Sequence, residues 1–152
     1  MRTVIVGCDN AGVGLKNILE KHMQEQDINV IDVGCDTSED NTYYPYIAKK
    51  VCDKIIESDY KVDGLLICGT GLGMAMTANK FKGIRAAVCH DIFSVTRAKL
   101  SNNANVICMG ERVLGVEVAK RILDEWLSLN FVDGSSTAKV QAILDIEDNN
   151  LR

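Results

Sequence analysis

The sequence lacks an excess of positive charge and any long apolar run, and it contains a single proline. Lys and Arg number 17 against 21 Asp and Glu, which gives a net charge of −4. Because phosphate-binding surfaces need clustered cations, a nucleic-acid partner is not expected. No apolar run approaches the roughly 18 residues of a membrane-spanning helix, so no membrane partner is expected either.

An export signal and a clustered set of metal-binding cysteines are also missing. Residues 1–7 run directly into a strand-like segment without a signal-peptide apolar region, which predicts a cytoplasmic protein with reduced thiols. No two cysteines form a C-x-x-C pair, so a structural zinc site has little support. No metal and no cofactor are expected. Three cysteines that end apolar runs are interpreted as inert small hydrophobes: Cys8, Cys89 and Cys108.

What the sequence does contain is an alternation of short β-branched runs with longer segments of helical period. Strands are expected near 3–6, 29–33, 64–68, 84–89 and 105–109, with a helix after each. The length of 152 residues suits one domain. The pattern predicts a three-layer α/β/α, Rossmann-like domain over residues 1–152, with a five-stranded parallel sheet.

An additional helix follows the last expected strand–helix unit. It lies within 135–152, after the polar stretch 133–136, and Val140, Ile143 and Leu144 share one of its faces. Because the sheet is already complete, this helix has no evident place in the layers. We expect it to pack on a partner subunit.

The segment Cys68–Gly73, with the sequence CGTGLG, is the strongest chemical signal. Three alternating glycines allow backbone N–H groups to point into one concavity at a helix N-terminus, which favours a phosphate or an oxyanion. The spacing matches neither a dinucleotide-binding loop nor a P-loop, and Met74 stands where a phosphatase loop would have arginine. We interpret it as an anion-stabilising loop with the Cys68 thiol placed for proton transfer. The alternative is an ordinary turn with an inert cysteine.

Other candidate residues follow the expected strands, where ligands bind in open parallel sheets. Asp9 either hydrogen-bonds a polyol hydroxyl or caps the first helix, and the sequence does not decide between these roles. His90 is a candidate ligand contact and Arg112 a candidate anion binder, whereas Arg85 is interpreted as structural and His22 as a surface residue.

Several short motifs together resemble one family. They are Gly7-Cys8-Asp9 after the first strand, Tyr44-Pro45, the Cys68–Gly73 loop, Ala78-Asn79-Lys80 and Gly83-Ile84-Arg85-Ala86. From Thr3 to about Ile143 the chain resembles the ribose-5-phosphate isomerase B and galactose-6-phosphate isomerase family.

This resemblance implies metal-free aldose–ketose isomerisation of a sugar phosphate, either ribose 5-phosphate or a related pentose or hexose phosphate, through a cis-enediolate. Cys68 would be the base that moves a proton between C1 and C2, and Thr70 would assist ring opening. The family forms dimers or tetramers, with the last helix reaching into the neighbour's site. The remaining implied contacts are Asp9, Asn10, Tyr44 and Asn102 for the sugar, the amides of Gly69, Gly71, Leu72 and Gly73 for the enediolate, and Arg112 and Lys139 for the phosphate.

Four positions depart from the family pattern. Asn10 and Ser101 stand where the family has histidines, and Ser135 and Lys139 stand where it has phosphate-binding arginines. Loss of one charge-assisted contact of roughly 1.5–3 kcal/mol would weaken phosphate binding about tenfold or more. Three alternatives follow: an isomerase for a sugar phosphate other than ribose 5-phosphate, a non-catalytic or hetero-oligomeric sugar-binding subunit, or an isomerase for an unphosphorylated sugar.

Overall fold

The protein is built around a parallel five-stranded sheet, which a computed structural model describes together with the rest of residues 1–151. The strand order is β2-β1-β3-β5-β4, so β1, β3 and β5 lie in the interior. The strands are β1 (Thr3–Cys8), β2 (Asn29–Asp32), β3 (Asp63–Cys68), β4 (Ala86–Val88) and β5 (Val106–Gly110).

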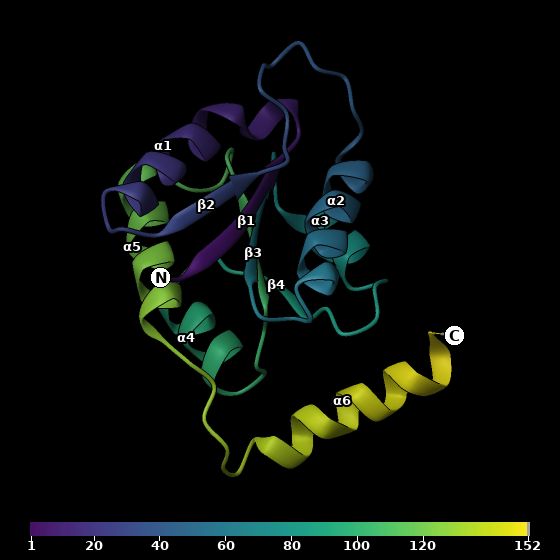
Figure 1. The fold of residues 1–152 in the computed structure, drawn as a ribbon. Coiled ribbons are helices and arrows are strands. Elements are labelled where there is room, and N and C mark those ends of the chain that lie inside the picture. Colours follow the sequence, from purple (N-terminus) through teal and green to yellow (C-terminus); the bar gives the residue numbers. More distant parts are fainter. Residues whose placement is uncertain (152) are drawn as a thin grey trace.

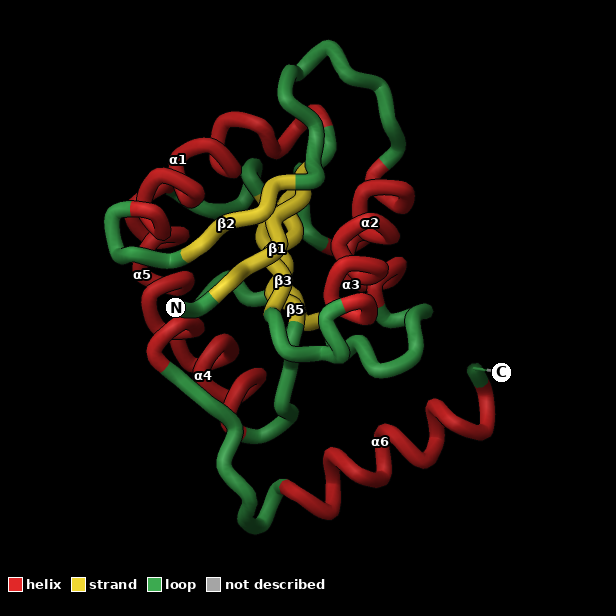
Figure 2. Tube along the Cα trace, in the orientation of Figure 1, coloured by secondary structure: helices red, strands yellow, loops and turns green. Residues whose placement is uncertain are grey.

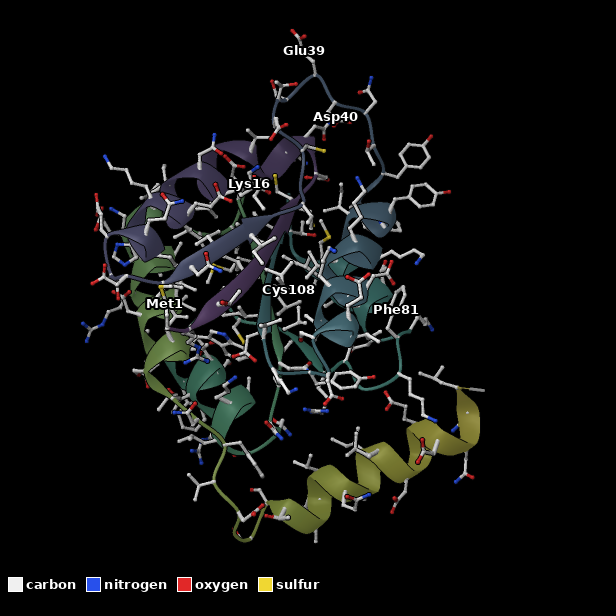
Figure 3. All side chains as sticks on the ribbon, in the orientation of Figure 1. Met1, Lys16, Glu39, Asp40, Phe81 and Cys108 are labelled. Atoms are coloured by element: carbon white, nitrogen blue, oxygen red, sulfur yellow. The ribbon has the colours of Figure 1, made fainter. Side chains whose placement is uncertain are left out.

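Helices cover both faces of this sheet (Figure 1, Figure 2). One face carries α1 (Val13–Gln24), α4 (Ile92–Leu100) and α5 (Val116–Ser128), and the other carries α2 (Tyr44–Glu57) and α3 (Leu72–Ala78). A single 3-10 turn, η1 (Asn10–Gly12), precedes α1. The predicted three-layer α/β/α fold with a parallel five-stranded sheet is therefore confirmed. Cys108, labelled in Figure 3, lies in the centre of its buried core.

The two edge strands differ from their sequence-based expectation. A parallel strand was expected to be buried on both faces, but β2 is largely exposed and Ile31 keeps 40% of its surface accessible. Strand β4 begins at Ala86 rather than at 84, because the N–H groups of the two preceding residues bond outside the sheet ladder, one in a turn and one to a side chain. Ile84 donates to the Phe81 carbonyl and Arg85 donates to Oδ1 of Asn105.

The last helix, α6 (Thr137–Asn150), stands apart from the three layers (Figure 1). Its last turns are tied to the turn that precedes β4: Glu147 accepts the Gly83 N–H at 2.9 Å, and Asp148 pairs with Lys82 at 2.7 Å. Ile143 and Ile146 remain exposed. The helix thus lies at the amino edge of the sheet with much of its apolar surface uncovered. Among the described helices, none has the length and apolarity to cross a membrane.

Candidate active site

The Cys68 loop occupies the centre of the carboxyl edge, because β3 lies between β1 and β5. Gly71 has φ +78°, and its N–H donates to Sγ of Cys68 at 3.0 Å. A Cβ at Gly71 would also lie 3.0 Å from the Met109 carbonyl carbon. Positive φ and this close approach both require glycine. The loop conformation that aims an amide at the sulfur therefore depends on Gly71.

Helix α3 begins directly after this turn. The N–H groups of its first turn have no acceptor inside the helix, and they form the positive end of the helix dipole. Two backbone hydrogen bonds join the loop to the turn after β5. The Glu111 N–H donates to the Cys68 carbonyl at 2.9 Å, and the Arg112 N–H donates to the Gly69 carbonyl at 3.0 Å. Leu72 N–H also donates to Oγ1 of Thr70 at 3.3 Å. These bonds fix the backbone of the loop against the turn that follows β5.

The other five cysteines are poor sources of a thiolate. Desolvation by burial raises the pKa of Cys8, Cys52 and Cys89 to about 12 and that of Cys35 to about 11, and it raises the pKa of Cys108 well above its usual value. These thiols stay protonated at neutral pH. That agrees with the inert role inferred for three of them.

Two side chains from other elements flank the loop. A Cβ at Gly73 would lie 2.4 Å from Cε2 of Tyr44, so the tyrosine ring packs directly on Gly73. A Cβ at Gly69 would lie 3.3 Å from Nη1 of Arg112, so that guanidinium reaches across Gly69. A phenol from the start of α2 and a cation from the turn after β5 thus border the same loop.

A cavity of about 570 Å³ opens beside Tyr44. Asp9 lines it, and Oδ1 of Asp9 also accepts the Ala11 N–H at 3.0 Å. Asp9 therefore caps η1 and faces the cavity, so the two roles weighed from the sequence are compatible. Cys68 is 5% exposed and does not itself line this cavity, which adjoins the loop through Tyr44. The remaining lining residues are Asn10 and Asn41–Pro45.

His90 follows β4 and lies near the end of β5. Its Nε2 accepts the Gly110 N–H at 2.9 Å, so the ring is neutral with its proton on Nδ1. Desolvation lowers the pKa of His90 below 6.5, consistent with this state. Nε2 is therefore committed to the backbone, and only Nδ1–H is free to contact a ligand.

Glu111 and the loop that precedes α2 contribute groups that the sequence analysis did not single out. The Glu111 carboxylate lies beside the start of α1, where a Cβ at Gly14 would come within 2.9 Å of its Oε1, and burial raises its pKa, with Asp9 acting in the same direction. Asn41 and Thr42 line the cavity beside Tyr44. The sequence signal for Glu111 was its position directly after a strand. The signal for Asn41 and Thr42 was their place in a polar segment next to Tyr44. Among residues 1–151, no three His, Cys, Asp or Glu side chains are grouped to hold a metal ion.

Comparison with known proteins identifies the family. A model described as Ribose/Galactose Isomerase matches residues 4–143. The chain is 46% identical over 147 residues to D-erythrulose-4-phosphate isomerase 2 of Mycolicibacterium smegmatis, covering 95% of this chain and 96% of that protein. It is 44% identical to a ribose-5-phosphate isomerase B of Listeria innocua, covering 97% and 98%.

The chain belongs to the ribose/galactose isomerase family. It is a sugar phosphate aldose–ketose isomerase, as its resemblance to the ribose-5-phosphate isomerase B family implied. A solved structure of ribose-5-phosphate isomerase B from Mycoplasma genitalium with bound ribulose 5-phosphate superposes with a TM-score of 0.92 at 33% identity, covering 97% of each chain.

Two residues that the family resemblance places at the site lie elsewhere in the isomerase chain. Asn102 follows α4, in the turn that enters β5 at the amino edge of the sheet, and it lines a separate cavity of about 470 Å³ against α6. Lys139 is exposed on α6. A six-residue strand at about 3.3 Å per residue separates that edge from Cys68 by roughly 20 Å. One chain does not bring these residues together with Cys68.

Proposed function

We propose that this isomerase interconverts an aldose phosphate and a ketose phosphate through a cis-enediolate, with the Cys68 thiolate as the base. The observation that supports this most directly is the Gly71 N–H directed at the Cys68 sulfur, at the edge of a loop lined with amides. Proton abstraction next to a carbonyl creates an oxyanion, and fixed N–H dipoles in a water-poor site stabilise such charge.

The chemical steps assigned to the loop balance as follows. The thiolate of Cys68 removes the proton from the carbon next to the carbonyl, and that C–H electron pair forms the C=C bond of the enediolate. The amides of Gly69–Gly73, Leu72 among them, hold the developing oxyanion. The hydroxyl proton of the carbon that lost hydrogen passes to the adjacent cis oxyanion. The same thiol then returns its proton to the neighbouring carbon, so that the carbonyl moves by one position. Thr70 lies at the loop rim and assists ring opening where the substrate is cyclic.

The remaining contacts divide between the sugar and its phosphate. Asp9, Asn10 and Tyr44 line the cavity next to the loop and are assigned to sugar hydroxyls. Arg112 reaches across Gly69 and is assigned to the phosphate. His90 is assigned to the substrate through its Nδ1–H alone. Each role extends the family resemblance onto the positions that this structure supplies.

A second copy of the chain would complete the site. Asn102 and Lys139 lie at the amino edge, and Ile143 and Ile146 of α6 are exposed beside Asn102, in the cavity that all three line. In a homodimer or a tetramer, the amino edge of one copy would bring Asn102, and its α6 would bring Lys139, to the Cys68 loop of another copy. This assembly explains why two substrate contacts lie far from Cys68 within one chain.

For the substrate, we propose an open-chain, four-carbon sugar phosphate over ribose 5-phosphate. Ribose 5-phosphate closes its furanose ring through the 4-hydroxyl, whereas a tetrose 4-phosphate has that oxygen esterified and stays open. Asn10 and Ser101 replace the two family histidines, one of which opens the ring, so an acyclic substrate would tolerate their loss. Two relatives, at 46% and 42% identity, are D-erythrulose-4-phosphate isomerases.

The base is tested by Cys68→Ala, with Cys52→Ala as the matched control because Cys52 is buried in α2, with its pKa raised to about 12. We expect Cys68→Ala to lower kcat at least a thousandfold with an unchanged circular dichroism spectrum and retained substrate binding. Cys52→Ala should keep kcat within a few-fold. An unchanged rate in Cys68→Ala would remove Cys68 as the base.

The substrate is tested by measuring kcat/KM on the purified chain for erythrulose 4-phosphate, ribose 5-phosphate, allose 6-phosphate, galactose 6-phosphate and the free sugars. We expect the highest kcat/KM for erythrulose 4-phosphate. A higher kcat/KM for ribose 5-phosphate would reject the open-chain preference while leaving the isomerase proposal in place. Equal rates on free sugars would favour an unphosphorylated substrate, and inactivity without a partner chain would favour a hetero-oligomer.

A further inference from the structure

A second large cavity lies at the opposite edge of the sheet from Cys68. It also measures about 570 Å³, and it surrounds the first residues of β1 and β3 and the last turn of α4. Its lining shares no residue with the cavity beside Tyr44 or with the cavity that contains Asn102. It is therefore a different cavity from these two, although Asn103 in its lining directly follows Asn102 in the chain.

The charges in this cavity do not balance. Arg2, Lys61 and Lys99 line it, and Asp63 is its one carboxylate among the described residues. Arg2 Nη2 and Lys99 Nζ both donate to the same oxygen, Oδ2 of Asp63, at 2.6 and 2.7 Å. Within the lining, one negative charge thus faces three positive ones, and Asp59 pairs with Lys61 from outside the lining.

Part of this positive charge is fixed in the wall of the cavity. The Lys99 side chain is 6% exposed, its Nζ donates to the Ala104 carbonyl at 3.3 Å, and it lies 4.1 Å from the centre of the Trp126 ring. Burial lowers the pKa of Lys99, although Asp63 opposes this effect. A buried cation is stabilised when further negative charge approaches it, because the protein interior screens charge weakly.

Free hydrogen-bond donors surround the fixed charge. Lys61 is 77% exposed, and its ion pair with Asp59 is long, at 3.7 Å. The carboxamides of Asn103 and Asn130 line the cavity and make no hydrogen bond to residues 1–151. Cationic nitrogens together with neutral amide donors match a phosphate group carried on a polar body.

We propose that this amino-edge cavity binds a phosphate monoester, with Arg2 and Lys61 contacting the phosphate and Asn103 and Asn130 contacting the polar remainder. The site requires no participation of Cys68 and stands independently of the proposed reaction. The natural ligand would be a small phosphorylated metabolite. It would bind about 20 Å from the Cys68 loop, which is the length of a six-residue strand.

The test is a titration with inorganic phosphate, and then with glycerol 3-phosphate, at constant ionic strength maintained with chloride. Backbone amide NMR signals of Lys61, Asn103 and Asn130 report on this cavity, whereas that of Gly69 reports on the isomerase site. We expect saturable shifts of the amino-edge signals, with tighter binding of the ester. Absent shifts, or shifts that chloride alone reproduces, would overturn the proposal.

Two variants and a matched control locate the binding. Lys61→Glu and Asn130→Ala change exposed side chains, and each should weaken binding at the amino edge, Lys61→Glu at least tenfold, while kcat/KM stays unchanged. Lys21→Glu is the control, because Lys21 is equally exposed at 78% and has a similar long ion pair, at 3.9 Å to Glu25. Equal weakening in Lys61→Glu and Lys21→Glu would mean that only net charge matters, and would reject the site.

Discussion

At the scale of single residues, glycines determine the geometry around Cys68. Gly71 directs an amide at the sulfur from a left-handed conformation, Gly73 leaves room for the Tyr44 ring, and Gly69 leaves room for the Arg112 guanidinium. A side chain at any of the three positions would displace a group assigned to substrate or to the base. The motif that stands out in the sequence is therefore a packing requirement as much as an anion-binding loop.

Gly71→Ala tests this requirement. We expect a loss of about 1–2 kcal/mol in the free energy of unfolding, since a left-handed conformation costs an alanine that much. A fall in kcat larger than the change in KM should accompany it, because the amide at the sulfur shifts. Gly115→Ala is the control, with φ −71° and no atom within 4 Å of the added Cβ. Denaturant unfolding and steady-state kinetics measure both effects, and equal behaviour of the two variants would contradict the argument.

At the scale of elements, a buried ion pair joins α1 to β2 and to the loop beyond it. Apolar spacing predicts that Ile18 shares the buried face of α1, yet Ile18 is 38% exposed and Lys16 is 1% exposed. Lys16, labelled in Figure 3, pairs with Asp32 at the end of β2 and donates to the Cys35 carbonyl at 2.8 Å. Burial next to Asp32 raises the pKa of Glu20 to about 7, with Lys16 opposing the shift.

Glu20→Gln tests this cluster through pH. The pKa of Glu20 in the folded protein, about 7, exceeds the ordinary value of 4.5. The free energy of unfolding of the wild-type protein therefore falls as pH rises from 4.5 to 7. The variant does not titrate. We expect its stability relative to wild type to increase across that window by up to about 1 kcal/mol per pH unit.

Urea unfolding at pH 4.5, 6 and 8 measures this difference. Glu117→Gln serves as the control because Glu117 is 87% exposed on α5. A stability difference for Glu20→Gln that does not vary with pH would show that Glu20 ionises normally in the folded protein.

At the scale of the whole molecule, the two edges of the sheet have different roles. The carboxyl edge holds the Cys68 loop, Tyr44 and Arg112, whereas the amino edge holds Asn102, α6 and the cavity around Asp63. An isomerase site that needs both edges cannot be built within one chain. The position of α6 therefore supports the proposal that the enzyme is an oligomer.

Subunit complementation tests this arrangement. Cys68→Ala and the double variant Asn102→Ala/Lys139→Ala should each be nearly inactive alone. After co-refolding, mixed oligomers would contain some sites with both edges intact, so we expect the recovered activity to exceed the sum of the separate samples. Co-refolding of Cys68→Ala with Cys68→Ser is the control, because both defects lie on the same edge. Failure to recover activity would reject shared sites.

The sequence by itself determined the layered fold, the family and the Cys68 loop, because each depends on local spacing: apolar runs of a given length and glycines at alternate positions. Only the tertiary structure decided that Lys16 replaces Ile18 in the interior, that Tyr44 packs on Gly73, and that Asn102 lies far from Cys68. These depend on which segments the chain brings together, since a buried charge is acceptable only where a distant residue such as Asp32 pairs with it.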